Sequence, residues 1–168
     1  MKKVDRAWLK EHDACSDGYE YWCENCEGKT NRLQIIILAK YRSDWAYWVL
    51  TRLLDTKQNR QLAIFAAQQV LPIFEKKFPK DKRPRRAIRA AIKVIKKDNT
   101  CNKAAAYAAY TAACAAAAST DAAAADAAAW AADAADAAAW AVGAAAGDAM
   151  KMKIMKYGLT LLKEGLDI

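Results

Sequence analysis

The chain has very few of the residues on which catalytic sites are usually built. Its 168 residues include a single histidine, His12. The sequence contains no Gly-rich phosphate-binding loop and no dinucleotide-binding motif, and no serine or cysteine stands in a nucleophile-elbow context. These absences exclude the common nucleotide-dependent and nucleophile-dependent enzymes. We therefore predict a protein that is not an enzyme.

Signals for β-strands are scarce as well. The chain has only six glycines and three prolines, and no stretch sustains the alternation of apolar and polar residues that is typical of a half-buried strand. The run IIIL at 35–38 favours a strand by composition, but it lies within NRLQIIILAKY, which also fits a buried helix. We predict an all-α fold, a compact multi-helix bundle with alanine-rich, close-packed C-terminal helices.

The sequence also shows no secretory leader. Its first residues, MKKVDRAWLKEHD, are charged throughout and contain no apolar core of the kind that a signal peptide needs. The five cysteines are an odd number, which fits free thiols better than a set of disulfides. We therefore expect a cytoplasmic protein with reduced cysteines.

What the chain does have is positive charge and tryptophan. The net charge is +8, which favours an anionic partner such as a nucleic acid, a nucleotide, an acidic protein or a lipid surface. The six tryptophans can each bury a large area in a core. We predict one helical domain over 1–168, with an N-terminal helical segment (1–42), a basic helical core (43–97), and alanine-rich helices with a closing C-terminal helix (103–164).

Several residues predict where the helices begin and end. Gly18 is expected to break the helix that is predicted near the N-terminus. Ser43 or Asp44 can cap DWAYWVLTRLL, because a short oxygen side chain accepts hydrogen bonds from the free N–H groups of a first helical turn. Thr56 can do the same for QNRQLAIFAAQQVLPIF, and Pro72 is expected to kink that helix or stop it near its end.

A strongly one-sided helix is predicted after the connector FPKDKRP. Pro84 fits the first turn of PRRAIRAAIKVIKK, where a missing N–H group costs nothing. One side of this helix is apolar and should face the core: Ala87, Ile88, Ala91, Ile92 and Ile95. Basic residues occupy the rest of its surface: Arg85, Arg86, Arg89, Lys93, Lys96 and Lys97.

The segment 104–149 contains 30 alanines in 46 positions. Alanine is the best helix former, so we predict helix rather than disorder. A membrane span is not expected, because carboxylates such as Asp126 would lie in its middle. Trp130 and Trp140 fall on one helical stripe, and a break at Ser119-Thr120 would divide the segment into two packed helices. The C-terminal segment should close the bundle with Ile154, Met155, Leu159 and Leu162.

Two stretches resemble known protein families. RQLAIFAAQQVLPIFEKKFPKDKRPRRAIRAAIKVIKK, from Arg60 to Lys97, resembles the core of a helical family of immunity proteins from bacterial toxin systems, and the likeness extends over about residues 45–150. WLKEHDACSDGYEYW resembles a short segment at the start of many phage and mobile-element proteins. The likeness implies an all-helical binding protein without catalytic chemistry. Many immunity proteins against basic nuclease toxins are acidic, whereas this chain is basic, which argues against a nuclease as the target.

Two sets of residues have the composition of a metal or acid–base site. His12, Cys15, Cys23 and Cys26 have the form H-x2-C-x7-C-x2-C, and two close pairs of such ligands can hold a tetrahedral zinc ion. However, Cys23 and Cys26 lie in a segment that is predicted to be helical rather than on tight turns.

The aspartates of the alanine-rich segment have no histidine near them in the sequence: Asp121, Asp126, Asp133 and Asp136. We interpret them as exposed or paired with arginines. We therefore predict no metal and no cofactor.

The densest positive charge is the basic run: Lys76, Lys77, Lys80, Lys82, Arg83, Arg85, Arg86 and Arg89. Arginine forks suit phosphate or carboxylate oxygens, and the start of a helix favours anions. Tyr47 and Trp48 can cover an aromatic ring if their helix lies alongside. The predicted ligand-binding residues are Arg83, Arg85, Arg86, Arg89, Tyr47 and Trp48.

Three functions remain open at this point. The first is a non-enzymatic neutralising protein of a phage or mobile element that captures an anionic ligand, such as a nucleotide-type signal of a host defence pathway. The second is an immunity-type inhibitor that binds a toxin or effector protein through a surface patch. The third is a general nucleic-acid binder, with affinity that falls steeply with salt. No membrane partner is expected, and self-association into a homo-oligomer stays open.

Overall fold

The computed structural model of the chain describes residues 3–97 and 148–164. Within these residues every regular element is a helix and no strand occurs, which confirms the predicted all-α class. The helices are α1 (Arg6–Glu11), α2 (Ser16–Asn25), α3 (Asn31–Tyr41), α4 (Ser43–Leu53), α5 (Thr56–Lys77), α6 (Arg83–Lys96) and α10 (Asp148–Glu164). The alanine-rich segment, with Trp130, Trp140 and the predicted break at Ser119-Thr120, lies outside the described residues.

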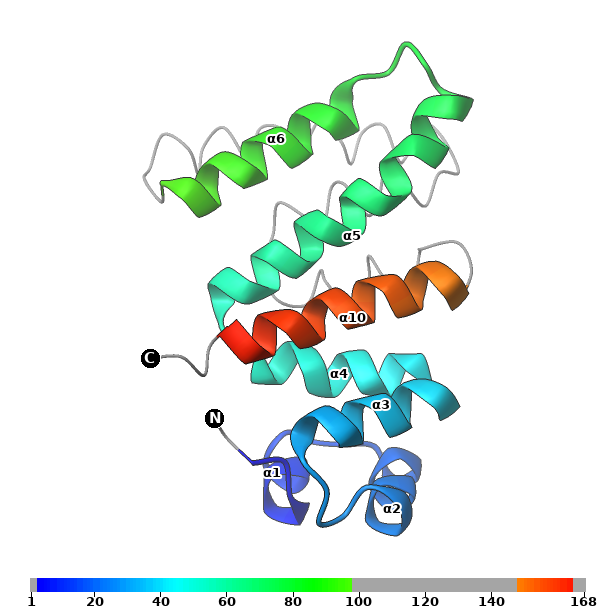
Figure 1. Cartoon of the computed structure of the whole chain (residues 1–168), viewed down its shortest axis with the longest axis vertical. Coiled ribbons are helices and arrows are strands. Elements are labelled where there is room, and N and C mark those ends of the chain that lie inside the picture. The colour runs from blue at the N-terminus through cyan, green and yellow to red at the C-terminus, as the bar shows by residue number, and fades with distance from the viewer. Residues whose placement is uncertain (1–2, 98–147, 165–168) are drawn as a thin grey trace.

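The helices follow one another along the long axis of the molecule. From one end to the other the order is α6, α5, α10, α4 and α3, with α1 and α2 beyond α3 (Figure 1). The helices α4 and α5 are neighbours in the sequence, but α10 lies between them and packs on both. None of the described helices combines the length and the apolar content that crossing a bilayer requires.

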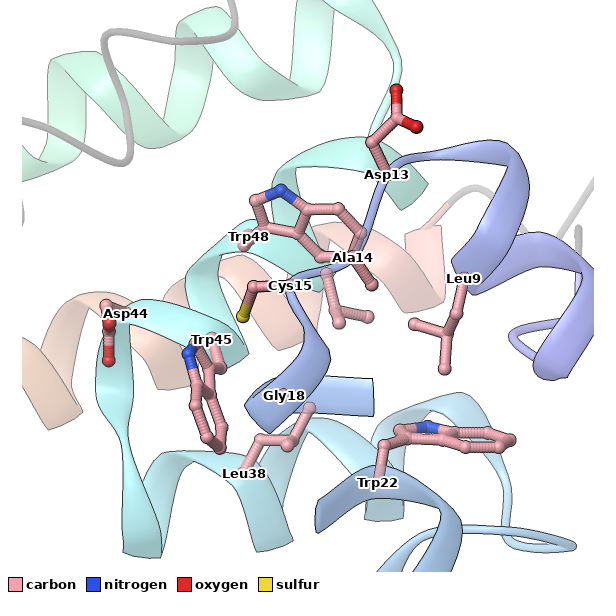
Figure 2. Close-up of a pocket in the computed structure, with 11 residues that line it drawn as sticks. Leu9, Asp13, Ala14, Cys15, Gly18, Trp22, Leu38, Asp44, Trp45 and Trp48 are labelled. Carbon is pink, nitrogen blue, oxygen red and sulfur yellow. The ribbon is translucent and has the colours of Figure 1, made fainter. Parts of the chain in front are cut away.

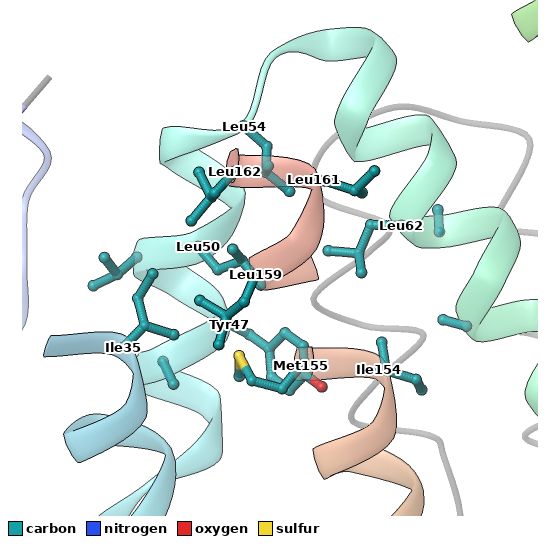
Figure 3. Close-up of a cluster of buried hydrophobic side chains, with 14 of the residues drawn as sticks. Ile35, Tyr47, Leu50, Leu54, Leu62, Ile154, Met155, Leu159, Leu161 and Leu162 are labelled. Atoms are coloured by element: carbon teal, nitrogen blue, oxygen red, sulfur yellow. The ribbon is translucent and has the colours of Figure 1, made fainter. Parts of the chain in front are cut away.

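The C-terminal helix α10 carries the centre of the core. Its buried side chains meet Leu50 of α4 and Leu62 of α5, both fully buried (Figure 3). The predicted closing residues are all buried in α10, which confirms that prediction: Ile154, Met155, Leu159 and Leu162. Gly158 permits the close approach, because a Cβ atom placed there would lie 2.5 Å from Leu50 Cδ2 and 3.3 Å from Leu62 Cδ1.

The first three helices are held together by buried hydrogen bonds as well as by apolar contacts. The amide of Gln34, which has no exposed surface, donates to the carbonyl oxygens of Val4 and Lys29 at 3.2 and 2.8 Å and accepts from Trp22 Nε1 at 3.2 Å. Asn31 Oδ1 accepts from the Val4 N–H at 3.0 Å. These bonds hold the segment around Val4, which precedes α1, against α3. They are needed because a buried polar group without a partner is costly.

The run IIIL is helical, as the alternative interpretation of NRLQIIILAKY predicts. In α3 the buried positions are Asn31, Gln34, Ile35 and Leu38, which are spaced three and four residues apart. Thr30 caps the helix by accepting from Leu33 N. The helical spacing of the buried side chains, together with this cap, outweighs the β preference of three consecutive isoleucines.

The break that we placed at Gly18 is wrong. Gly18 lies inside α2, and the break falls at 12–15, where Asp13 has a φ of 55°. The glycine is needed for packing instead, because a Cβ atom there would lie 3.0 Å from Cys15 Sγ and 3.5 Å from the Trp45 ring.

Two predicted caps are also wrong. The helix α4 begins at Ser43 after Arg42 and has no side-chain cap, since Asp44 pairs with Arg42 instead. At the start of α5 the cap is Asp55, not Thr56. Asp55 Oδ1 accepts from Gln58 N at 2.7 Å and Gln58 Oε1 accepts from Asp55 N at 2.9 Å, a reciprocal capping box. The helix α5 continues through Pro72 to Lys77.

Candidate functional site

The helix α6 has the two faces that the sequence predicts. Its inner face is buried at Pro84, Ala87, Ile88, Ala91 and Val94 and packs against α5. Its outer face is basic, and five of its side chains are exposed: Arg86, Arg89, Lys93, Lys96 and Lys97. The helix lies at one end of the molecule (Figure 1), and its exposed outer face is positively charged.

The N-terminus of α6 already holds a carboxylate of the chain itself. Asp81 Oδ1 accepts from the Arg83 N–H at 2.9 Å, and the Arg83 guanidinium closes on both carboxylate oxygens at 2.7–3.1 Å. The guanidinium holds the pKa of the Asp81 carboxyl below its ordinary value. Arg83 is thus a partner of Asp81, at the point where the sequence predicts a site for an external anion.

Arg85 is paired in the same way. Its guanidinium donates to both oxygens of Glu75, Nε to Oε1 at 2.6 Å and Nη2 to Oε2 at 2.5 Å. This bond lowers the pKa of the Glu75 carboxyl and raises that of Arg85. The pair joins the end of α5 to the start of α6.

Arg86 and Arg89 remain available to a partner. Both are exposed, and neither forms an ion pair with any described residue. They stand three positions apart, so their side chains share one face of the helix. Of the four predicted arginines, these two carry charge that the described part of the chain does not compensate.

Tyr47 belongs to the core rather than to a ligand site. Its ring is 2% exposed, and its hydroxyl donates to the carbonyl oxygen of Lys151 in α10. Burial raises the pKa of this hydroxyl well above its ordinary value. The predicted site required the helix of Tyr47 and Trp48 to lie alongside the arginines. It does not, because α10 and α5 lie between α4 and α6 (Figure 1).

Trp48 is part-buried and lines a cavity of about 280 Å³ at the other end of the molecule. Figure 2 shows its indole together with those of Trp45 and Trp22 around this space. The guanidinium of Arg52 lies 4.0 Å from the centre of the Trp48 ring, and that of Arg42 lies 4.7 Å from the centre of the Trp45 ring. The structure thus divides the predicted site residues between two distant places.

Apart from Trp48, the residues that line this cavity were not among the predicted site residues, and neither were the flanking Arg42 and Arg52. One signal was available: Arg42 precedes Trp45 by three positions and Arg52 follows Trp48 by four, which are the spacings of contacting residues on a helix. The rest of the lining comes from α1, α2, α3 and the turn between α1 and α2, and no sequence pattern relates these segments to α4.

The candidate zinc ligands differ in their burial and in their contacts. His12 Nδ1 lies 2.8 Å from the carbonyl oxygen of Trp8 and its ring stacks on the Trp8 indole. Cys15 is exposed and Cys23 is partly buried, whereas Cys26 is fully buried, and burial raises the pKa of its thiol. Among the described residues no three His, Cys, Asp or Glu side chains gather into a set that could hold a metal ion.

Comparison with known proteins gives one result. No curated protein and no solved structure matches the chain. Residues 52–164 match the family described as Imm-5 like putative immunity protein. This range covers most of the chain, from the end of α4 through α10, and it includes the whole of α5 and α6. The helices α1, α2 and α3 and the tryptophans around the cavity precede it. The match confirms the resemblance given by the motifs between Arg60 and Lys97, and the chain belongs to this family of Imm-5 like immunity proteins.

Proposed function

We propose that the protein is an immunity-type inhibitor that neutralises a toxin or effector protein by binding it, without catalysis, in the bacterial cytoplasm. Membership of the immunity family supports the class of partner. The outer face of α6 is the surface on which we place the contact, because it is exposed and basic over its whole length. The partner should therefore present an acidic patch.

The single observation that carries this placement is the uncompensated pair Arg86 and Arg89. Arginine is enriched at the energetic centres of protein interfaces, where its planar fork binds carboxylates with two hydrogen bonds. The pairs Arg83–Asp81 and Arg85–Glu75 hold the base of the helix rigid beside it. A preorganised helix face loses little conformational freedom when a partner binds.

A charge-reversal pair with a matched control tests the proposal. The native chain, the Arg86→Glu/Arg89→Glu variant and the Lys40→Glu/Lys57→Glu variant are each co-expressed with a toxin from which the native chain protects cells, found by screening candidate toxins. Lys40 and Lys57 are exposed on α3 and α5, and the two variants change the net charge equally. We expect the α6 variant to lose both growth protection and co-purification of the toxin, while the control variant keeps both.

Each contrary result has a defined meaning. If the α6 variant protects as well as the native chain, the interface is not on α6. If the native chain neither protects cells from any candidate toxin nor co-purifies with one, the immunity function itself is wrong. Thermal melts of all three proteins establish that the comparison is between folded chains.

Capture of a nucleotide-type defence signal, as by a phage or mobile-element protein, is the second candidate. It is favoured by the same two arginines, which are exposed and unpaired among the described residues. Titration calorimetry with a panel of cyclic and linear nucleotides distinguishes it from the first. Binding by the native chain that disappears in Arg86→Glu/Arg89→Glu would support capture, and no binding by the native chain would reject it.

A further inference from the structure

The cavity beside Trp48 is a second site, and it lies outside the part of the chain that matches the immunity family. Four helices and the turn between α1 and α2 build it (Figure 2). Its lining consists mainly of aromatic and aliphatic side chains: Leu9, Asp13, Ala14, Cys15, Gly18, Trp22, Leu38, Asp44, Trp45, Trp48 and Val49. We propose that this pocket binds an uncharged planar aromatic molecule of one or two fused rings.

The size of the cavity supports a ligand of this class. An apolar cavity of about 150 Å³ admits a benzene-sized molecule. The cavity beside Trp48 has a volume of about 280 Å³, which leaves room for a second fused ring. The volume lies at the lower end of the range for ligand sites, which is about 300–1,000 Å³, so the cavity suits a small aromatic molecule.

The indoles that form the walls are held in place before any ligand arrives. Trp22 Nε1 donates to Gln34 Oε1 at 3.2 Å, in the buried network that joins the first helices to α3. Trp45 and Trp48 each carry a stacked guanidinium, from Arg42 and Arg52. Rigid aromatic walls favour a flat ring, because they offer stacking and edge contacts without loss of side-chain freedom.

The charged side chains that line the cavity disfavour an anion. Its lining contains two carboxylates, Asp13 and Asp44, and no lysine or arginine. Asp44 is paired with Arg42, so the guanidinium beside Trp45 is already neutralised. An anionic ligand would leave water without gaining a cation from the lining, which is unfavourable.

Cys15 provides a direct probe of occupancy. Its thiol lies in the cavity lining and is accessible, whereas Cys23 lies outside the lining. A bound ring should therefore slow alkylation of Cys15 by iodoacetamide and leave the rate at Cys23 unchanged, which mass spectrometry of the peptides can measure. Indole is the neutral probe, and indole-3-acetate is the anionic probe with the same ring.

We expect indole to slow the alkylation of Cys15 severalfold at millimolar concentration, and indole-3-acetate to need about tenfold more for the same effect. The Trp48→Ala variant should weaken indole binding about tenfold, as measured by ligand-observed NMR. Ile73→Ala is the control, because Ile73 on α5 is 48% exposed and does not line the cavity.

Two results would overturn the proposal. One is equal alkylation of Cys15 in the native chain with and without indole. The other is indole binding that persists unchanged in a folded Trp48→Ala variant. The cysteine measurement uses the native chain, so it decides the matter even if Trp48→Ala fails to fold. Neither measurement uses a toxin, so the test of this cavity is independent of the test of the α6 interface.

Discussion

Residues 3–51 and 52–97 are adjacent in the sequence, yet they are built from different chemistry. The first part contains four of the six tryptophans and is nearly neutral, with seven lysines and arginines against eight aspartates and glutamates. The second contains no tryptophan, and it has fourteen basic residues against three acidic ones. The positive charge of the whole chain is therefore a property of the part that carries the family match, not of the N-terminal helices.

The two parts are also held together differently. In the N-terminal part, buried amides of Gln34 and Asn31 position the chain through specific hydrogen bonds. Between α5 and α6 the contact is an apolar stripe with an ion pair at one end. A rigid aromatic cavity and an exposed basic face are therefore stabilised by different kinds of interaction. Geometry around the cavity is set by directional bonds, whereas the basic face needs only a helix packed on one side.

Gln34→Leu should have the largest effect, and it should be confined to the N-terminal part at first. It leaves Trp22 Nε1 and the carbonyl oxygens of Val4 and Lys29 without their partner. We expect the free energy of unfolding in urea to fall by about 3 kcal/mol, because each buried orphan group costs about 1–3 kcal/mol.

Hydrogen exchange should show the loss of protection in α1 and α2 before α5 and α6. The exposed glutamine Gln68 on α5 is the control, and Gln68→Leu should change stability by less than about 0.5 kcal/mol. Equal destabilisation by both variants would contradict the difference drawn between the two parts.

Gly158→Ala tests the helix that joins the two parts. The new Cβ atom would lie 2.5 Å from Leu50 Cδ2, and Leu50 is fully buried, so either the Leu50 side chain or one of the helices must shift. We expect a loss of about 1–3 kcal/mol, as for other overpacked cores. Leu50→Val shortens the opposing side chain, and the double variant should recover part of that loss. Additive effects in the two thermal melts would show that the contact is not the cause.

Tyr47→Phe should have a smaller effect at the same junction. The hydroxyl of Tyr47 links α4 to the Lys151 carbonyl oxygen of α10, and its removal leaves the ring in place. We expect a loss of about 1 kcal/mol, the usual net value of one hydrogen bond. A decrease of several kcal/mol in the urea titration would mean that the ring itself has moved.

Glu75→Gln should have the smallest effect, and the effect should depend on pH. The folded-state pKa of Glu75 is lowered from its ordinary value of 4.5, so the ion pair with Arg85 contributes to stability above that value. Its contribution should be lost as the pH falls below 4.5 through the folded pKa.

The melting temperatures of the native chain and Glu75→Gln should therefore differ slightly at pH 7 and converge as the pH falls below 4.5 through the folded pKa. Glu20→Gln, at an exposed position of α2, is the control. A difference that grows on acidification would have the wrong sign and would exclude the ion pair as its source.

Features that depend on neighbours in the sequence were predicted correctly. The two faces of α6, the helical state of IIIL and the buried side of α10 all follow from residues spaced three and four apart. Helix starts were predicted less well. Asp55 rather than Thr56 caps α5, because Gln58 is placed to complete a reciprocal pair of bonds and both residue types make good caps on their own.

The sequence by itself determined an all-α chain, an immunity-type motif between Arg60 and Lys97, and a basic face on the helix that starts near Pro84. These features arise from local spacing and composition. Only the tertiary structure decided that α10 separates α4 from α5, that Tyr47 is core, and that Trp48 faces a cavity far from α6. The physical reason is that these outcomes depend on contacts across about a hundred residues of chain, such as Tyr47 with Lys151. Helical periodicity states which side of a helix is buried, but not which helix covers it.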